Sequence, residues 1–368
     1  MEIENGGTGV PPVNGHGQDA HGTKEKLLKK ESLGKLLEKM LQAGKTVYAP
    51  KKQKNRVDFQ SVTSAEELAV DYIQTTQSAK AIVFPKVEEL FRFRKGSNGL
   101  EVVDKKLDSL PEVVLFAVHP CDAAALNPLK TIFNWDYQDS QFNTRHSKLT
   151  IIGLSCSKGD DYCFCTSVGI SPGDTSGSDI LLTRLSGGDY LVEIITEKGR
   201  AIVDLASDLF LSAPSEDKEG NLAKIPQKFS VEEVKDRITA LFDNGALWEE
   251  QSLRCLGCGA CAYVCPTCAC FDIQDEGTQR HGVRLRCWDS CGFSMFTLHT
   301  SGHNPREVQS QRWRQRLMHK FSYMPDRLNV LGCVGCGRCS RACPVDMNLK
   351  EHLTAIMSET TLQREAKS

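Results

Sequence analysis

The sequence has 368 residues, of which 40% are hydrophobic, and its formal net charge is −2 at pH 7. This length and apolar content suffice for two domains, each with its own hydrophobic core. The near-neutral charge argues against a polyanion-binding protein. No run approaches a membrane span and the N-terminus lacks a secretory signal pattern, so we expect a cytoplasmic protein. In that compartment thiols stay reduced, and the 16 cysteines indicate metal binding rather than disulfides.

The first two segments of the chain differ in composition. Residues 1–22 are rich in Gly, Asn and Pro with almost no apolar side chains, which predicts a disordered tail. Residues 24–43 carry leucines at helical spacing, and Gly44 stands where a C-terminal cap belongs. This pattern predicts one amphipathic helix.

Short β-rich runs alternate with helical stretches in the next part of the chain. The runs cover residues 47–49, 81–84, 113–118, 149–154, 180–185 and 190–195. The central runs are continuously apolar, as in parallel strands that are covered on both faces. A capping box at Ser64 and Glu67 predicts a helix start. We therefore predict an α/β domain over residues 23–229.

Four cysteines follow two of these predicted strands. Cys121 comes after residues 113–118, Cys156 comes after residues 149–154, and a loop then leads to Cys163 and Cys165. If the two strands are parallel neighbours, their carboxyl ends meet at one edge of the sheet. The four thiols are then predicted to hold an iron-sulfur cluster of the 4Fe-4S type. The alternative is a lone nucleophile or packing residue at Cys121 and a structural zinc site at the other three.

A polar segment, residues 204–229, predicts a linker or surface loop. Ser230 and Glu233 form a second capping box, which predicts a helix that runs to about residue 243. We place the domain boundary here and predict a mainly helical, ferredoxin-like domain over residues 230–368. The predicted fold class is α+β.

Two copies of a C-x2-C-x2-C-x3-C-P run organise this second domain. Two-cluster ferredoxins use this spacing, and the fourth cysteine of each run ligates the cluster of the other run. The predicted ligands of one 4Fe-4S cluster are Cys255, Cys258, Cys261 and Cys343. The predicted ligands of the other are Cys333, Cys336, Cys339 and Cys265. Zinc is the alternative, but a zinc site uses only four sulfurs. Because exposed clusters are oxidised by oxygen, we also expect an anaerobic host.

Four further cysteines lie in the insert between the two runs. They are Cys268, Cys270, Cys287 and Cys291. Two interpretations stay open: the thiols ligate a fourth metal centre, or they pack as small hydrophobic residues beside the clusters.

The insert also contains a basic cluster. It consists of Arg306, Arg312, Arg314, Arg316 and Lys320, with His303 and His319. Basic residues interleaved with aromatic ones can bind nucleic acid. The same charges can compensate anionic iron-sulfur clusters or dock an acidic partner. We favour this second interpretation and expect no nucleic-acid ligand.

These motifs together resemble a known family, the iron-sulfur beta subunits of sulfhydrogenases and NAD(P)-linked nickel-iron hydrogenases. They are also similar to an iron-sulfur subunit of anaerobic sulfite reductase. The matching stretches are His-Pro-Cys121-Asp, Cys156 with Cys163-Phe-Cys165, Cys265-Pro-Thr-Cys268-Ala-Cys270-Phe-Asp, Trp288-Asp-Ser-Cys291, Gly302-His-Asn-Pro-Arg306 and Cys333-Val-Gly-Cys336. The family pattern has no cysteine at position 287.

The resemblance implies a chain that relays electrons between two other subunits. One of them contains flavin and oxidises NAD(P)H, and the other is a catalytic redox subunit of the hydrogenase, sulfite reductase or heterodisulfide reductase type. The chain itself has no G-x-G-x-x-G after a predicted strand and no complete phosphate-binding loop, which agrees with hydride chemistry elsewhere in a complex. We therefore expect a hetero-oligomer in which a partner subunit binds flavin and this chain has no catalytic residues.

Two alternatives belong to other functional classes. The first is a stand-alone iron-sulfur reductase with a substrate site at the insert cysteines, for which the isolated chain would turn over NAD(P)H or sulfite. The second is a nucleic-acid-binding iron-sulfur protein, for which binding would weaken steeply with salt.

Overall fold

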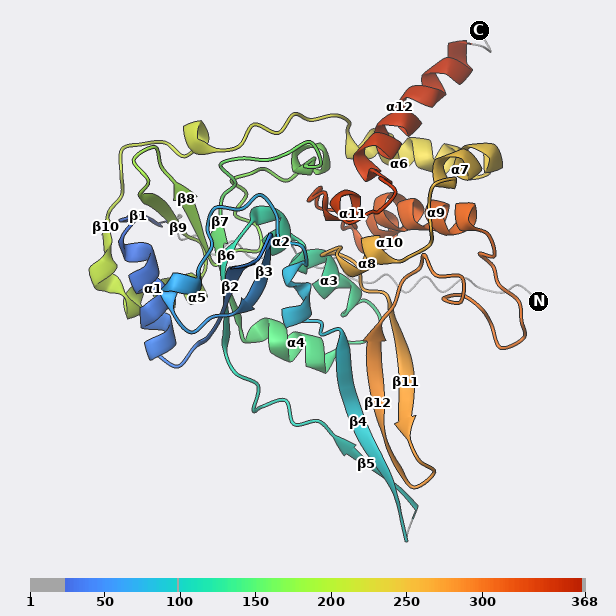
Figure 1. The fold of residues 1–368 in the computed structure, drawn as a ribbon, viewed down its shortest axis with the longest axis horizontal. Coiled ribbons are helices and arrows are strands. Elements are labelled where there is room, and N and C mark those ends of the chain that lie inside the picture. Colours follow the sequence, from blue (N-terminus) through green and yellow to red (C-terminus); the bar gives the residue numbers. More distant parts are fainter. Residues whose placement is uncertain (1–23, 98, 366–368) are drawn as a thin grey trace, which may run out of the picture.

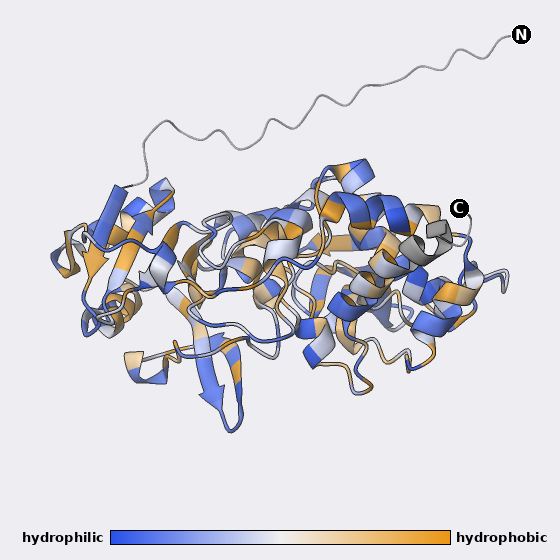
Figure 2. Cartoon of the chain, turned by 90° about the horizontal axis from the view of Figure 1, so that it is seen from above, coloured by the Kyte–Doolittle hydropathy of each residue, from blue (hydrophilic) through white to orange (hydrophobic). Residues whose placement is uncertain are grey.

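The computed structural model describes residues 24–97 and 99–365, so the predicted tail, residues 1–22, lies outside the described residues. The described chain contains an eight-stranded sheet, a four-stranded sheet and a group of helices (Figure 1). The sheet-rich region and the helical region lie side by side along the length of the molecule (Figure 2). This mixed architecture confirms the predicted α+β class.

The eight-stranded sheet has the order β10-β1-β9-β8-β7-β6-β2-β3. Its strands are β1 (Lys24–Leu28), β2 (Thr46–Gln53), β3 (Arg56–Ser61), β6 (Val113–Val118), β7 (Leu149–Leu154), β8 (Ile180–Arg184), β9 (Tyr190–Ile194) and β10 (Phe210–Ser212). The central pairs β2/β6, β6/β7 and β7/β8 are parallel. The outer pairs are antiparallel. The carboxyl ends of β6 and β7 therefore lie at the same edge of the sheet.

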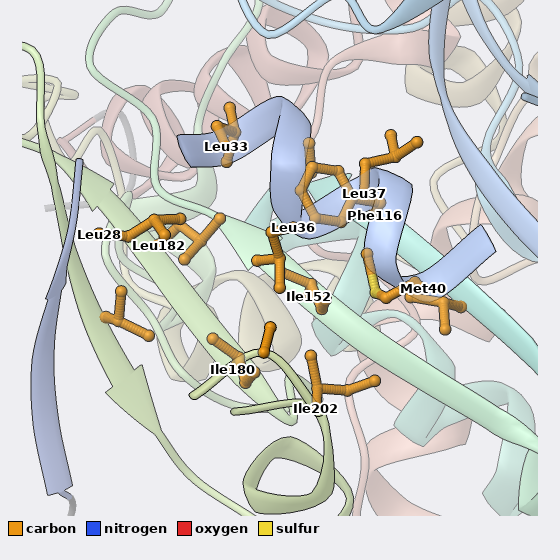
Figure 3. Close-up of a cluster of buried hydrophobic side chains, with 14 of the residues drawn as sticks. Leu28, Leu33, Leu36, Leu37, Met40, Phe116, Ile152, Ile180, Leu182 and Ile202 are labelled. Atoms are coloured by element: carbon orange, nitrogen blue, oxygen red, sulfur yellow. The ribbon is translucent and has the colours of Figure 1, made fainter. Parts of the chain in front are cut away.

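Helices cover both faces of this sheet. Alternate residues of β6 point to opposite faces, so Phe116 packs in one hydrophobic cluster and Leu115 packs in another. On the first face, α1 (Ser32–Gln42) places Leu36 and Met40 over the strands (Figure 3). On the second face lie α3 (Leu126–Ile132) and α4 (Ser140–Ser147). The central strands are buried, as their continuous apolar runs predicted.

Three of the predicted elements differ in the structure. The helix predicted over residues 24–43 begins only at Ser32, because residues 24–28 form β1 between β9 and β10. The run at residues 81–84 is not a strand: residues 79–82 form a short 3-10 turn. The capping box at Ser64 opens only another such turn, at residues 65–67, and Glu67 pairs with Lys51 on β2 instead.

The four-stranded sheet joins segments that are far apart in the sequence. It has the order β11-β12-β4-β5 and consists of β4 (Val87–Gly96), β5 (Gly99–Asp104), β11 (Phe271–Gly277) and β12 (His281–Trp288). These strands extend from the body of the molecule as an arm (Figure 1). Buried Glu88 on β4 pairs with Arg286 on β12 and with Arg145 on α4, which fixes the base of the arm. The arm thus contains strands from both sides of the boundary that we predicted at residues 229 and 230.

The remaining helices are α5 (Glu197–Leu205), which packs on the same face of the eight-stranded sheet as α1, and those of the C-terminal core and the cysteine-bearing turns. The latter are α2 (Pro120–Ala124), α6 (Val231–Ala240), α7 (Gly245–Ser252), α8 (Ala260–Tyr263), α9 (Gln309–Met318), α10 (Met324–Leu328), α11 (Arg338–Arg341) and α12 (Leu349–Glu365). Ser230 caps α6 by accepting a hydrogen bond from the backbone of Glu233, as the second capping box predicted. Phe164, from the N-terminal part, is buried in the same core as Trp248. None of the helices in the described residues has the length and apolar character needed to cross a membrane.

Candidate iron-sulfur sites

Site 1 is a cavity in the first cysteine run. Its lining includes the predicted set, Cys255, Cys258, Cys261 and Cys343. Cys255 and Cys258 lie in the loop between α7 and α8, where Gly257 and Gly259 have φ values of +65° and +72°, and Cys261 lies in α8. The left-handed conformation is readily adopted by glycine and turns the loop around the cavity. The fourth cysteine, Cys343, follows α11 in the second run.

Site 2 is the corresponding set in the second run. It consists of Cys265, Cys333, Cys336 and Cys339. Gly335 and Gly337 repeat the left-handed turns of site 1, with φ values of +62° and +69°. Burial raises the pKa of Cys333 to about 11, and the nearby Cys265 and Cys339 contribute to the increase. Three of the four thiols are buried, so site 2 lies in the interior.

Site 3 lies at the edge of the eight-stranded sheet. Its cavity is lined by Cys121, Cys156, Cys163 and Cys165. Cys121 is in α2, directly after β6, and Cys156 follows the parallel strand β7. The end of β6 is irregular, because Ala117 adopts a φ of +56° and its carbonyl accepts a hydrogen bond from Tyr72 at 2.6 Å. Such bulges redirect a strand end beside functional sites.

The three sites lie in a row, with site 2 in the middle. Cys339 of site 2 lines the cavity of site 1, and Cys336 and Gly335 of site 2 line the cavity of site 3. The loops of sites 2 and 3 touch through their backbones, since Phe164 N–H donates to Gly335 O at 2.9 Å. A Cβ atom on Gly335 would lie 2.5 Å from the Cys165 backbone nitrogen. Only glycine permits this approach.

Arg338 connects sites 2 and 3 through a buried ion pair that the sequence did not reveal. The guanidinium donates to Asp122 Oδ1 at 2.8 Å, and both residues are almost completely buried. It also donates to Thr75 O at 3.0 Å. Asp122 neighbours Cys121, and Arg338 neighbours Cys339. No sequence motif predicts this ion pair, because its two residues are 216 positions apart.

Several side chains donate hydrogen bonds to the cysteine sulfurs. Gln309 Nε2 lies 3.1 Å from Cys255 Sγ in site 1, and Arg341 lies 3.3 Å from Cys163 Sγ in site 3. Such donors favour the thiolate form that a metal requires and tune the potential of a bound cluster. Gln309 and Arg341 were not among the predicted site residues, because a hydrogen bond to sulfur leaves no spacing signal.

Burial changes the acidity of the thiols. It raises the pKa of Cys261 and that of Cys336 to about 12 and that of Cys165 to about 11. Burial also acts to raise the pKa of Cys265, but the Lys320 ammonium and the Arg316 guanidinium lower it to about 7. Metal binding must therefore displace protons from most of these thiols.

The insert cysteines divide into two groups. Cys268, Cys270 and Cys291 line one further cavity. Cys287 is not among its lining residues, because it lies on β12 opposite Asp272 of β11. The structure thus brings together three of the four cysteines that we considered for a fourth centre.

The residues of the basic cluster lie in different surroundings. Arg316 and Lys320 are buried, and Lys320 Nζ lies 3.3 Å from Cys265 Sγ. Arg316 donates to Cys261 O at 3.0 Å. Arg314 instead stacks on Phe242, with its guanidinium carbon 4.0 Å from the ring centre. Arg316 and Lys320 are thus positioned to compensate the negative charge of iron-sulfur clusters.

Single zinc ions and 4Fe-4S clusters hold their sulfurs differently. Zinc holds each of its sulfurs at about 2.3 Å. No three His, Cys, Asp or Glu side chains within the described part of the chain converge on a position for a single metal ion. A 4Fe-4S cluster binds each thiolate through a different iron atom, so its four sulfurs lie farther apart around a cavity.

Comparisons with known proteins agree with the motifs. Residues 254–347 match a family described as a 4Fe-4S dicluster domain, which implies two 4Fe-4S clusters in this part of the chain. The chain is also 32% identical to sulfhydrogenase 2 subunit beta of Pyrococcus furiosus over 305 residues, which are 81% of this chain and 88% of that relative. The predicted resemblance is confirmed. The chain belongs to the family of sulfhydrogenase beta subunits, iron-sulfur proteins with a 4Fe-4S dicluster domain.

Proposed function

We propose that the chain relays single electrons through three 4Fe-4S clusters between two partner subunits of an oxidoreductase complex. One partner is a flavin-containing, NAD(P)H-oxidising subunit. The other is a catalytic redox subunit of the hydrogenase, sulfite reductase or heterodisulfide reductase type. The bound clusters supply one-electron redox chemistry. The cysteines of sites 1, 2 and 3 would hold these three clusters.

The observation that carries this proposal is the order of the sites. Site 2 contributes lining residues to the cavities on either side of it, so each cluster would have a neighbour for electron exchange. The middle of the row is buried, whereas Cys258 of site 1 is exposed. A relay needs this arrangement, because water must be kept from the intermediate carrier while an end remains accessible to a partner.

The chain's own residues provide the binding and the electrostatics. The thiolates hold the clusters, and Lys320 places positive charge beside site 2 without contacting bulk water. Positive charge near a cluster favours the reduced, more negative state and raises its potential. At site 1, Leu253 and Leu256 are 80% and 66% exposed and flank the exposed Cys258, which suits a surface that a partner covers.

The test combines anaerobic isolation with a site 3 variant. The co-purifying subunits are identified, and the iron and sulfide contents and the EPR spectra are compared between the wild type and Cys121→Ser. The variant should lose about four iron atoms per chain, the content of one 4Fe-4S cluster, and should slow electron transfer from NAD(P)H to the catalytic subunit. Cys287→Ser serves as a control outside the three sites. Unchanged iron in Cys121→Ser would exclude a cluster at site 3, and NAD(P)H turnover by the isolated chain would contradict the relay.

A further inference from the structure

The cavity formed by the insert cysteines belongs to none of the three sites. The sequence brings its thiols together through the β11/β12 hairpin: Cys268 and Cys270 precede β11, and Cys291 follows β12. The hairpin register is held at this end by a hydrogen bond from Asp289 N–H to Cys270 O at 3.0 Å. The strand pairing therefore positions Cys291 next to the earlier two thiols.

The cavity has room for a cluster. Its volume is about 120 Å³, larger than those of site 1, about 40 Å³, and site 3, about 30 Å³. The Cys270 thiol is within hydrogen-bonding reach of the Cys268 and Cys291 thiols, so the three sulfurs are gathered together at this cavity.

Buried positive charge surrounds the cavity. Lys80, Arg316 and Lys320 are 3%, 6% and 5% exposed, and among the described residues none of them forms an ion pair with a carboxylate. Lys80 Nζ donates to Cys268 O at 2.9 Å and lies 4.0 Å from the centre of the Trp288 ring. A buried ammonium without an anionic partner is strongly unfavourable. Arg316 and Lys320 line the cavity and also face sites 1 and 2. Lys80 lies beside the lining, where it also donates to Ala262 O in α8 at 3.3 Å. An anion in the cavity would offset this buried positive charge.

The backbone is irregular at the opposite wall. Residues 319–323 form a π-helical turn after α9, and such turns occur frequently at functional sites. The turn places His319 and Lys320 together on the wall of the cavity. An imidazole is a known alternative to cysteine as a ligand of iron-sulfur clusters.

We propose that Cys268, Cys270 and Cys291 hold a fourth iron-sulfur cluster, with His319 at the position that a fourth cysteine would occupy. The cluster neutralises the buried cations around it. It lies beside site 2, because Lys320 lines this cavity and also donates to Cys265 Sγ. It is therefore a branch from the middle of the row and not an extension of either end.

Iron and sulfide analysis of anaerobically reconstituted protein tests this assignment. The wild type should contain about sixteen iron atoms per chain, four for each of four clusters. Cys270→Ser and Cys291→Ser should each lose about four of them together with the same EPR signal. The matched control is Cys287→Ser, which changes the same hairpin outside the cavity and should retain the full content. His319→Gln should shift the g-values of the signal that Cys270→Ser removes.

The outcomes separate this proposal from the relay. A Cys270→Ser variant with wild-type iron content overturns the fourth cluster and leaves the three-site relay intact. If the wild type has only about twelve iron atoms, one cluster is missing, and the losses in Cys121→Ser and Cys270→Ser show whether site 3 or the insert cavity is empty. A wild type with only about eight iron atoms overturns the fourth cluster together with site 3, even if the serine variants do not fold. A wild type without iron would overturn both. An unchanged EPR spectrum in His319→Gln would remove that residue from the fourth position.

Discussion

Replacing Arg338 with methionine should destabilise the protein strongly. The methionine keeps an unbranched side chain of similar length but removes the guanidinium, which donates to Asp122, Gln74 and Thr75. Asp122 is 3% exposed, so its carboxylate would remain buried without a counter-charge. Breaking a buried ion pair from one side costs about 3–5 kcal/mol. With an unfolding entropy of about 2.1 cal/mol/K per residue, this corresponds to a decrease in Tm of roughly 4–6 °C for a chain of this length.

The assay is thermal unfolding of the anaerobic protein, followed by circular dichroism at fixed protein and salt concentrations. Arg284→Met is the matched control, because Arg284 pairs with Asp275 on the arm where both side chains are more than 40% exposed. An exposed pair contributes about 1 kcal/mol or less. Adding Asp122→Asn to Arg338→Met should recover part of the loss, since it removes the unpaired charge. A Tm decrease no larger than that of the control, or additive losses in the double variant, would refute the reasoning.

Three further predictions concern other parts of the molecule. Gly335→Ala should reduce the iron content of site 3, because its Cβ would lie 2.5 Å from backbone atoms of Phe164 and Cys165. Gly257→Ala, at the equivalent position of the first run, has a similar positive φ, but its nearest contact is Gln309 Oε1 at 3.1 Å, so it should lose less iron. Iron analysis of both variants checks this. Lys320→Met should lower the reduction potential of site 2 in EPR-monitored titrations, because it removes the buried positive charge 3.3 Å from Cys265 Sγ. Another prediction concerns pH. Burial lowers the pKa of His352 to about 4, so as the pH falls below about 6.5 the His352 imidazole takes up a proton in the unfolded chain but stays neutral in the folded protein. The free energy of unfolding should therefore fall by at most about 3 kcal/mol as the pH is lowered from about 6.5 to about 4. Because His352 is partly exposed to solvent, the actual decrease should be smaller. His352→Gln should flatten this dependence in pH-dependent melts, and exposed His281→Gln should not.

The parts of the site that could be predicted are those governed by local covalent spacing or by strand direction. The two ferredoxin-type runs fix which thiols can face one cavity, because three of them lie within one short segment. Cys121 and Cys156 could be grouped because both follow runs that read as parallel strands. The helix predicted at residues 24–31 was wrong for the opposite reason: the leucines fit a helical period, but pairing with β9 and β10 decided the conformation.

Long-range contacts account for what the sequence did not reveal. The pairing of β4 with β12 joins strands almost 200 residues apart. Both strands alternate apolar and charged residues, as in Phe91–Arg94 and Val283–Arg286, but this local pattern does not identify the partner strand. Lys80 shows the same difficulty on a smaller scale. It lies in a short turn that read as part of a strand region, yet its ammonium is buried beside Cys268. Neither its spacing nor its neighbours in the sequence indicate a role in charge compensation.

The crossing of the two runs has a consequence for stability as well as for electron transfer. In the proposed ligand sets, site 1 takes Cys343 from the second run and site 2 takes Cys265 from the first. Clusters held in this way would each tie both halves of the dicluster domain together, with the insert and its arm between them. Because cluster binding is coupled to folding, the two clusters should stabilise one common structure and not two separate ones. Site 3 extends this coupling to the eight-stranded sheet, since Phe164 and Gly335 join its loop directly to that of site 2.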